Sequence, residues 1–222
     1  MSNILICDDE KDIVSALRIC LAAEGYEIFE AYNGMEALNV IRQNDIHLVL
    51  LDIMMPEMDG ISTLAKIRES YNMPVLFISA KSEDADKILG LNIGADDYIT
   101  KPFNIIEVVA RVKSNLRRYM RLGSNVSGSS RIEIGGLCLD DSEKTVTADG
   151  EEINLTPTEY EILKLLMKNP GKVFSPREIY EKVWKETLLG SENTVAVHIR
   201  HLREKLEINP AEPRYIKVVW GQ

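Results

Sequence analysis

Five short apolar runs alternate with segments of helical spacing over the first half of this 222-residue chain. The runs are NILIC, EIFEAY, HLVLLD, PVLFISA and DYIT, and a typical helical segment places Ile13, Leu17 and Leu21 four positions apart. Because parallel strands need crossover connections, the alternation predicts a five-stranded parallel sheet with helices on both faces. For this sheet we expect the order 2-1-3-4-5, one of the common doubly wound orders. In such a doubly wound α/β domain the site lies outside the carboxyl ends of the strands, where the strand order reverses.

The pattern changes after a Gly- and Ser-rich segment, RLGSNVSGSSR, which is typical of a flexible linker. Short strand candidates (IEI, LCLD, KTVTA, EEINL) then precede three helical segments. TPTE at 156–159 and SPRE at 175–178 predict capping boxes with Pro at the first helical position, and Ser191 is expected to cap the third helix. We therefore expect a first domain at 1–121, a linker at 122–130 and a second, α+β domain at 131–222.

Charge and composition restrict the expected cellular location of the chain and the partners that it binds. A net charge of -9 disfavours general attraction to nucleic acid, so any DNA contact must be local. No segment approaches the roughly 18 apolar residues that span a bilayer, and the N-terminus lacks a basic region followed by an apolar run, which predicts a cytoplasmic protein with no membrane partner. Cys7, Cys20 and Cys138 are widely spaced and are expected to be free thiols.

Carboxylates end two of the predicted strands. Asp8 and Asp9 follow the first strand and Asp52 ends the third, and these strands are neighbours at the switch point. Three like charges held close together need a compensating cation or protons, and Mg²⁺ is the natural candidate because it takes carboxylate oxygens. Taken singly, Asp9 could cap the following helix with Asp12, and Asp52 could belong to an Asx-turn.

The fourth and fifth strands end on polar side chains as well. Ser79 supplies a hydroxyl and Lys101 a cation that could pair with Asp52 or with a phosphate oxygen. A satisfied core hydroxyl and an exposed turn lysine are the plainer interpretations. The combination of acid, acid, hydroxyl and lysine at four strand ends favours a functional pocket.

The motifs DD at 8–9, DxxMPxxDG at 52–60, SA at 79–80 and KPF at 101–103 resemble the receiver domain of two-component response regulators. The resemblance implies that Asp52 accepts a phosphoryl group from a sensor histidine kinase. It implies that Mg²⁺ is held by Asp8, Asp9, Asp52 and the backbone carbonyl of Met54. It also implies that Lys101 contacts the phosphoryl group, that the Lys101–Pro102 bond is cis, and that Ser79 and Tyr98 move together as a switch. Without the resemblance, Tyr98 would be an ordinary half-buried strand aromatic.

Charges are patterned over the fourth helix, fifth strand and fifth helix. Such a mixture is normally a solvated surface that contributes little to stability. The chain also resembles the OmpR/PhoB branch of response regulators, in which matching positions join a symmetric dimer of phosphorylated receivers. The residues implicated are Lys87, Leu91, Asp96, Asp97, Glu107, Val109, Arg111 and Arg118.

The last helical segment, SENTVAVHIRHLREKLEI, places Val195, Ile199, Leu202 and Leu206 on one core face. Taken alone, its other side is best interpreted as a solvated surface. However, LTPTEYEIL and TVAVHIRHLREKL resemble the winged helix-turn-helix effector of the OmpR/PhoB family, which binds double-stranded promoter DNA. The resemblance implies a recognition helix at about 191–206 and a loop at 184–190 that touches RNA polymerase. The candidate DNA-binding residues are Asn193, Thr194, Val197, His198, Arg200, His201 and Arg203.

Three departures from the family pattern affect the expected DNA binding. Asn193 and His201 stand where many members have arginine, which predicts fewer phosphate contacts, and Ala196 replaces a frequent aspartate. A closing strand, KVVW, is expected near the end of the chain, but the second strand of the wing does not follow, so the wing is expected to be truncated. The YITKPF and NTV-VHIRHLREK stretches are similar to members that regulate vancomycin resistance and related cell-envelope responses.

Three other classes of protein remain as alternatives. An aspartyl-phosphate phosphatase also places an aspartate at a strand end, but it needs a second acid two residues on, where this chain has Met54. A dinucleotide-binding enzyme is disfavoured because no GxGxxG follows the first strand. A receiver whose output domain binds protein is favoured by the acidic second half. The leading prediction is a transcriptional regulator rather than an enzyme.

Overall fold

The chain, seen here as a computed structural model, is described over residues 2–80, 94–122, 131–185 and 192–219. It forms two compact units, Met1–Tyr119 and Met120–Gln222. Leu122, the first residue of the predicted linker, ends a helix, and the other linker residues lie outside the described ranges. Among the helices of these ranges, none has the length and apolar character needed to cross a bilayer.

The first unit is built on a five-stranded parallel sheet. Its strands are β1 (Asn3–Cys7), β2 (Glu27–Ala31), β3 (Leu48–Asp52), β4 (Val75–Ala80) and β5 (Asp97–Lys101). They lie in the order β2-β1-β3-β4-β5, and every pairing is parallel. The predicted doubly wound topology is therefore confirmed, with its switch point between β1 and β3.

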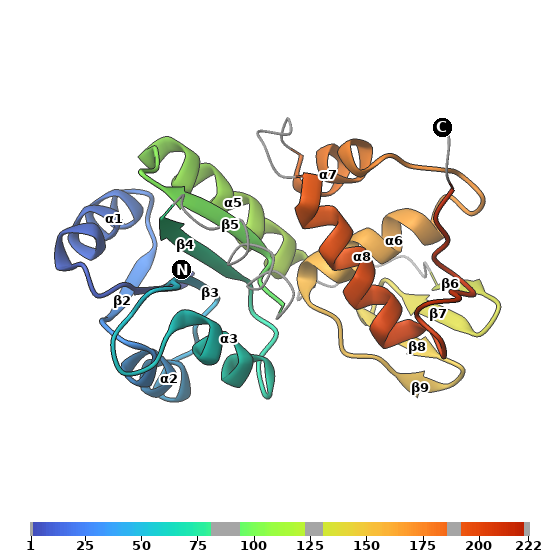
Figure 1. The fold of residues 1–222 in the computed structure, drawn as a ribbon, viewed down its shortest axis with the longest axis horizontal. Helices are drawn as coiled ribbons and strands as arrows, with labels where there is room; N and C mark the ends of the chain where they lie inside the picture. Colours follow the sequence, from blue (N-terminus) through green and yellow to red (C-terminus); the bar gives the residue numbers. More distant parts are fainter. Residues whose placement is uncertain (1, 81–93, 123–130, 186–191, 220–222) are drawn as a thin grey trace. The chain divides into compact units, whose positions relative to one another are not determined.

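Helices cover both faces of this sheet. The described helices are α1 (Lys11–Ala23), α2 (Gly34–Gln43), α3 (Gly60–Arg68) and α5 (Ile105–Leu122). Figure 1 shows α1 and α5 on one side of the sheet and α2 and α3 on the other. The expected fourth helix falls within 81–93, outside the described residues.

The central strands of this sheet are nearly all apolar because they are buried in the core on both faces. All five residues of β3 are buried, and Ile4, Leu5 and Ile6 of β1 have no exposed surface. A strand buried on both faces needs a continuous apolar run rather than an alternating one. The run Leu48–Leu51 therefore fixes β3 in the centre of the sheet and leaves Asp52 at its carboxyl end.

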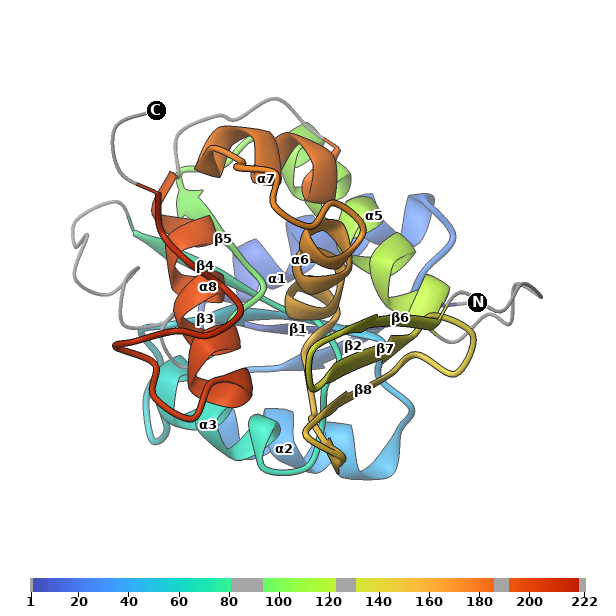
Figure 2. The same ribbon diagram turned by 90° about the vertical axis from the view of Figure 1, so that its right-hand side faces the viewer.

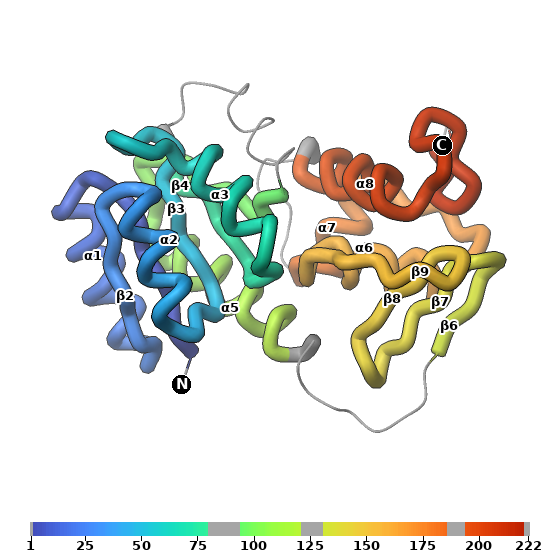
Figure 3. Tube along the Cα trace, turned by 90° about the horizontal axis from the view of Figure 1, so that it is seen from below, coloured from blue at the N-terminus to red at the C-terminus, as the bar shows by residue number. Residues whose placement is uncertain are grey.

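The second unit combines a small antiparallel sheet with three helices. The strands are β6 (Arg131–Ile134), β7 (Leu137–Asp140), β8 (Thr145–Ala148) and β9 (Glu151–Glu152), in sequential order. Figure 2 shows β6, β7 and β8 side by side. The helices are α6 (Pro157–Met167), α7 (Pro176–Trp184) and α8 (Glu192–Leu206), which pack on one another (Figure 3). The strand β6 contacts α6.

The two predicted capping boxes are confirmed. The Thr156 hydroxyl accepts the Glu159 backbone N–H while the Glu159 carboxylate accepts the Thr156 N–H, and Ser175 and Glu178 repeat this exchange. The expected cap at Ser191 lies outside the described residues. Val195, Leu202 and Leu206 of α8 are buried in the core, and Ile199 packs against it, as the spacing predicted.

The predicted closing strand KVVW is wrong for its described residues, 217–219, which form no strand. Residues near this segment are held by side chains instead. The Glu207 carboxylate accepts the backbone N–H groups of Arg214, Tyr215 and Ile216, and Arg203 Nε donates to the Ile216 carbonyl. A strand requires a partner's backbone groups, and in the described ranges no strand pairs with this segment.

Candidate functional site

Three carboxylates meet at the carboxyl ends of β1 and β3. The two strands pair with Cys7 beside Leu51, so the residues that follow, Asp8 and Asp52, come to the same edge. Oxygens of Asp8, Asp9 and Asp52 lie within 4.8 Å of one another. Asp8 and Asp52 are buried and Asp9 is exposed, so the cluster opens to solvent at Asp9.

The loop after β3 packs directly onto the cluster through Gly60. Its backbone N–H donates to the Ile53 carbonyl, 2.9 Å away. A Cβ at this position would collide with the backbone carbonyl of Asp52. Both groups belong to the main chain, so neither can turn aside as a flexible side chain could. Only glycine lets α3 begin this close to the end of β3, and the side chain of the preceding residue, Asp59, caps α3 by accepting the Ser62 N–H.

Lys101 brings a cation into the cluster from the end of β5. Its Nζ lies 2.9 Å from Asp8 Oδ2, 3.4 Å from Asp52 Oδ1 and 3.0 Å from Glu10 Oε1. The Lys101–Pro102 peptide bond that follows is cis, as the resemblance implied. Sequence reasoning did not single out Glu10. The only signal for it was the third acidic residue in the run DDE.

The electrostatics of the cluster show an excess of negative charge. Burial raises the pKa of Asp52 to about 6, the charge of Asp8 adds to the rise, and Lys101 only partly offsets it. Burial also raises the pKa of Asp8. Burial works to lower the pKa of Lys101, but its hydrogen bonds with Asp8 and Glu10 outweigh this and raise it. One lysine does not neutralise the buried acids.

These residues fit a small divalent cation. The donors that converge are carboxylate oxygens, which Mg²⁺ prefers, and the raised Asp52 pKa means that added positive charge would be favourable. Of the four proposed ligand residues, Asp8 and Asp52 are buried, and Asp9 lies at the exposed side of the cluster. Met54 has an exposed side chain on the loop after β3.

Ser79 lies near the carboxyl end of β4, and Tyr98 lies near the amino end of the neighbouring strand β5. β3 pairs with β4 so that Asp52 lies beside Ile78, which places Ser79 one residue beyond it. Ser79 is buried, and Tyr98 is also buried with 8% of its surface exposed. Tyr98 pairs with Phe77 on β4, two residues before Ser79.

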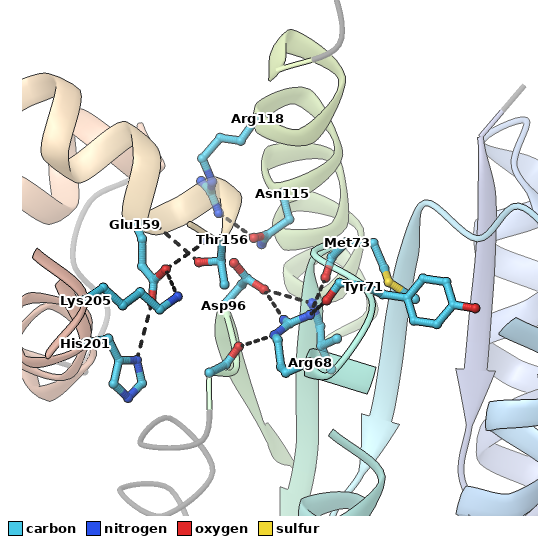
Figure 4. Close-up of polar contacts among 12 residues, drawn as sticks. Arg68, Tyr71, Met73, Asp96, Asn115, Arg118, Thr156, Glu159, His201 and Lys205 are labelled. Atoms are coloured by element: carbon cyan, nitrogen blue, oxygen red, sulfur yellow. Dashed lines mark hydrogen bonds and ion pairs between the residues drawn. The ribbon is translucent and has the colours of Figure 1, made fainter. Parts of the chain in front are cut away.

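Four charged residues of the predicted dimer surface, Asp96, Asp97, Glu107 and Arg111, are paired inside one receiver unit. Asp96 binds Arg68 at 2.9 Å (Figure 4). Asp96 also accepts the Val75 N–H. Arg111 binds Asp97 at 2.8 Å and Glu107 at 2.9 Å.

The other members of that set have varied surroundings. Arg118 donates to Ser114 and Asn115 of the same helix, and Val109 packs against the apolar core. Lys87 and Leu91 lie outside the described residues.

The predicted DNA-binding residues on α8 differ in exposure. Arg200 has 63% of its side chain exposed and pairs with Glu204. Arg203 is tied to the Ile216 carbonyl. Thr194, Val197, His198 and His201 are buried, and the Asn193 side chain lies outside the described part of the structure. Most of the predicted loop at 184–190 also lies outside it.

Two family models match the chain in separate parts. Residues 4–113 match the response regulator receiver domain, and residues 150–222 match the C-terminal domain of transcriptional regulatory proteins. The chain is 44% identical over 221 residues to the regulatory protein VanRc of Enterococcus gallinarum, covering 99% of this chain and 96% of that protein. It is 43% identical to the uncharacterized transcriptional regulatory protein YcbL of Bacillus subtilis, with 98% and 96% covered.

Solved structures agree with this assignment. DrrB of Thermotoga maritima, an OmpR/PhoB homologue, is 32% identical with a TM-score of 0.53, covering 99% of this chain and 96% of that one. A mutant form of RitR is 27% identical with a TM-score of 0.78, with 100% and 96% covered. The chain belongs to the OmpR/PhoB family of two-component response regulators, with a receiver domain and a DNA-binding effector domain.

Proposed function

We propose that the receiver accepts a phosphoryl group on Asp52 and that this modification controls promoter binding by the effector domain. The observation that carries the proposal is the convergence of Asp8, Asp9, Asp52 and Lys101 at the carboxyl ends of three parallel strands. The donor is a sensor histidine kinase, the partner that a receiver domain implies.

In the proposed reaction an Asp52 oxygen attacks phosphorus, forming a P–O bond, while the bond from phosphorus to the histidine nitrogen breaks and its electron pair leaves with the nitrogen. The central position of β3 holds Asp52 for this attack. Lys101, already 3.4 Å from Asp52, is placed to pair with the phosphoryl oxygens. Catalysis is largely positioning, because the carboxylate is itself the nucleophile.

Asp8, Asp9, Asp52 and the Met54 carbonyl would hold Mg²⁺. When bound, the ion neutralises charge on the phosphoryl oxygens. Glu10 and Asp8 hold Lys101 between them in the unmodified pocket, 3.0 and 2.9 Å from its Nζ. Lys101 is therefore already close to Asp52 before the transfer.

The signal leaves the pocket through Ser79 and Tyr98 in this proposal. A phosphoryl oxygen would accept a hydrogen bond from the Ser79 hydroxyl, and displacement of Ser79 would allow Tyr98 to turn inward. The surface that changes includes β5 and α5, where Asp97, Glu107 and Arg111 pair within one receiver. A symmetric dimer would form when such charges pair across two receivers instead.

The output is binding to promoter DNA through α8. Arg200 is the proposed contact with the strongest support, because its guanidinium is exposed and charge-assisted bonds to phosphate suit arginine. Contact with RNA polymerase through the 184–190 loop is part of the same proposal. Because the proposed phosphoryl donor and DNA are both inside the cell, we propose a cytoplasmic location.

Labelling by a small phosphodonor tests the acceptor. We expect acetyl phosphate with Mg²⁺ to add one phosphoryl group to the full chain, measured by intact mass, and we expect no addition to Asp52→Asn. Asp59→Asn is the matched control, because Asp59 is exposed on the same loop and asparagine keeps its capping role. Full labelling of Asp52→Asn, or loss of labelling only in Asp59→Asn, would refute the assignment.

A further inference from the structure

Two histidines and a glutamate gather in the effector domain. His198 and His201 lie three positions apart on α8, so they share one side of the helix, and their ring centroids are 6.4 Å apart. Glu159 comes from the first turn of α6. One ligand atom from each of the three residues lies within 4.8 Å of the other two.

Glu159 is oriented by two donors that bind the same carboxylate oxygen. Its Oε2 accepts the Thr156 N–H at 2.8 Å and lies 2.6 Å from Lys205 Nζ. Its other oxygen, Oε1, lies 3.6 Å from His201 Nδ1 (Figure 4). Bonds to one oxygen of a metal-binding carboxylate are the usual means of aiming the other at the ion.

The spacing and the donor types both suit a borderline transition metal. Ligand atoms about 2.0 to 2.1 Å from a tetrahedral Zn²⁺ are roughly 3.3 to 3.5 Å apart, close to the 3.6 Å between Glu159 Oε1 and His201 Nδ1. Imidazole nitrogens favour Zn²⁺ over Mg²⁺, which takes oxygen ligands. We propose that His198, His201 and Glu159 bind one Zn²⁺ ion in the effector domain, with water completing the coordination.

Lys205 opposes binding while it helps to aim the ligand. Its ammonium group, 2.6 Å from Glu159 Oε2, places a positive charge next to the proposed ion. Like charges in this position weaken each other's binding. The Lys205 charge therefore lowers the affinity of the site for Zn²⁺. Removal of this charge strengthens Zn²⁺ binding, whereas loss of an imidazole weakens it.

The proposed Zn²⁺ site joins two helices of the effector domain, so a bound ion would act on how these helices are held together. His201 and His198 both belong to α8, whereas Glu159 belongs to α6. A bound ion would tie α8, the proposed recognition helix, to α6. Zn²⁺ binding would then restrain α8 independently of phosphorylation at Asp52.

The test measures Zn²⁺ affinity of the full chain by competition with a chromophoric chelator, in excess Mg²⁺ to occupy the receiver pocket. The variants are His201→Gln, Lys205→Gln and His47→Gln. His47 is the third histidine of the chain and lies in the receiver beside Asp45, so it is the matched control. Circular dichroism confirms that each variant is folded.

We expect the unaltered chain and His47→Gln to bind one Zn²⁺ ion with equal affinity. His201→Gln should bind at least about tenfold more weakly, because even supporting residues of a metal site contribute that much. Lys205→Gln should bind more tightly. Equal affinity in His201→Gln and the unaltered chain, or a loss that appears only in His47→Gln, would overturn the proposal.

Discussion

Asp52 is the residue of the receiver pocket whose pKa reflects both burial and neighbouring charge. Its side chain is 5% exposed, the carboxylate of Asp8 is close by, and its pKa is raised to about 6. A carboxyl group whose pKa is higher in the folded than in the unfolded protein lowers the stability of the fold as pH rises above its unfolded pKa. In the metal-free receiver the ionised Asp52 carboxylate therefore lowers the stability of the fold at neutral pH.

The pH dependence of unfolding should reveal this cost. Between the unfolded value near 3.8 and the folded value of about 6, the native chain binds the extra proton, so its stability falls as pH rises through this window. In the presence of a chelator, Asp52→Asn should be more stable than the unaltered chain at pH 7.5 by roughly 2 to 3 kcal/mol, and by little at pH 4.

Denaturant unfolding of Asp52→Asn and of the unaltered chain at several pH values measures this difference. A constant difference between Asp52→Asn and the unaltered chain at every pH would mean that burial of the Asp52 charge has no such cost.

At the residue level, the pocket could be predicted from strand ends. Asp8, Asp52 and Lys101 each follow an apolar run, and parallel strands bring their carboxyl ends together. Glu10 could not be found in this way, because its contact depends on the path of the Lys101 side chain. The Glu159, His198 and His201 cluster joins two helices, and helical periodicity does not say which residues of separate helices meet.

At the level of elements, the sequence was enough to predict a helix where the segment makes its backbone hydrogen bonds within itself. The helices α6 and α7 begin at the predicted capping boxes, and the strand β7 has the predicted limits, LCLD. The segment KVVW has an equally apolar pattern, yet its described residues form no strand. A strand depends on a neighbour's hydrogen-bonding groups, and a pattern in one segment does not supply them.

The Ser175 cap offers a clean test of element stability. Ser175→Ala removes the hydroxyl that accepts the Glu178 N–H, so unfolding of the effector domain should become easier by about 1 kcal/mol. Ser175→Thr keeps the hydroxyl and should cost little. Tryptophan fluorescence during urea unfolding follows this domain, since both tryptophans, Trp184 and Trp220, belong to it. Equal losses in the two variants would show that the cap does not contribute.

At the level of the whole molecule, charge pairing within one receiver competes with pairing between two. Arg111 is bound to Asp97 and Glu107 in the single chain, and the proposed dimer needs such charges across the interface. We expect acetyl phosphate to shift the unaltered chain toward dimer in sedimentation and Arg111→Ala to weaken the shift.

Arg18→Ala is the matched control for that experiment. Arg18 pairs with Glu30 of β2, outside the proposed dimer surface, and its removal should leave the shift intact. If both variants dimerise like the unaltered chain, Arg111 has no part in the interface.

The central claim is that one aspartate in the receiver governs how tightly the effector domain binds DNA. The direct measurement is the affinity of the full chain for a site selected from random duplexes, with and without acetyl phosphate and Mg²⁺, in the unaltered chain and in Asp52→Asn. We predict that the phosphodonor strengthens binding by the unaltered chain and leaves Asp52→Asn unchanged at its unmodified affinity. An equal gain in both proteins, or a fully labelled chain whose affinity does not change, would contradict the account.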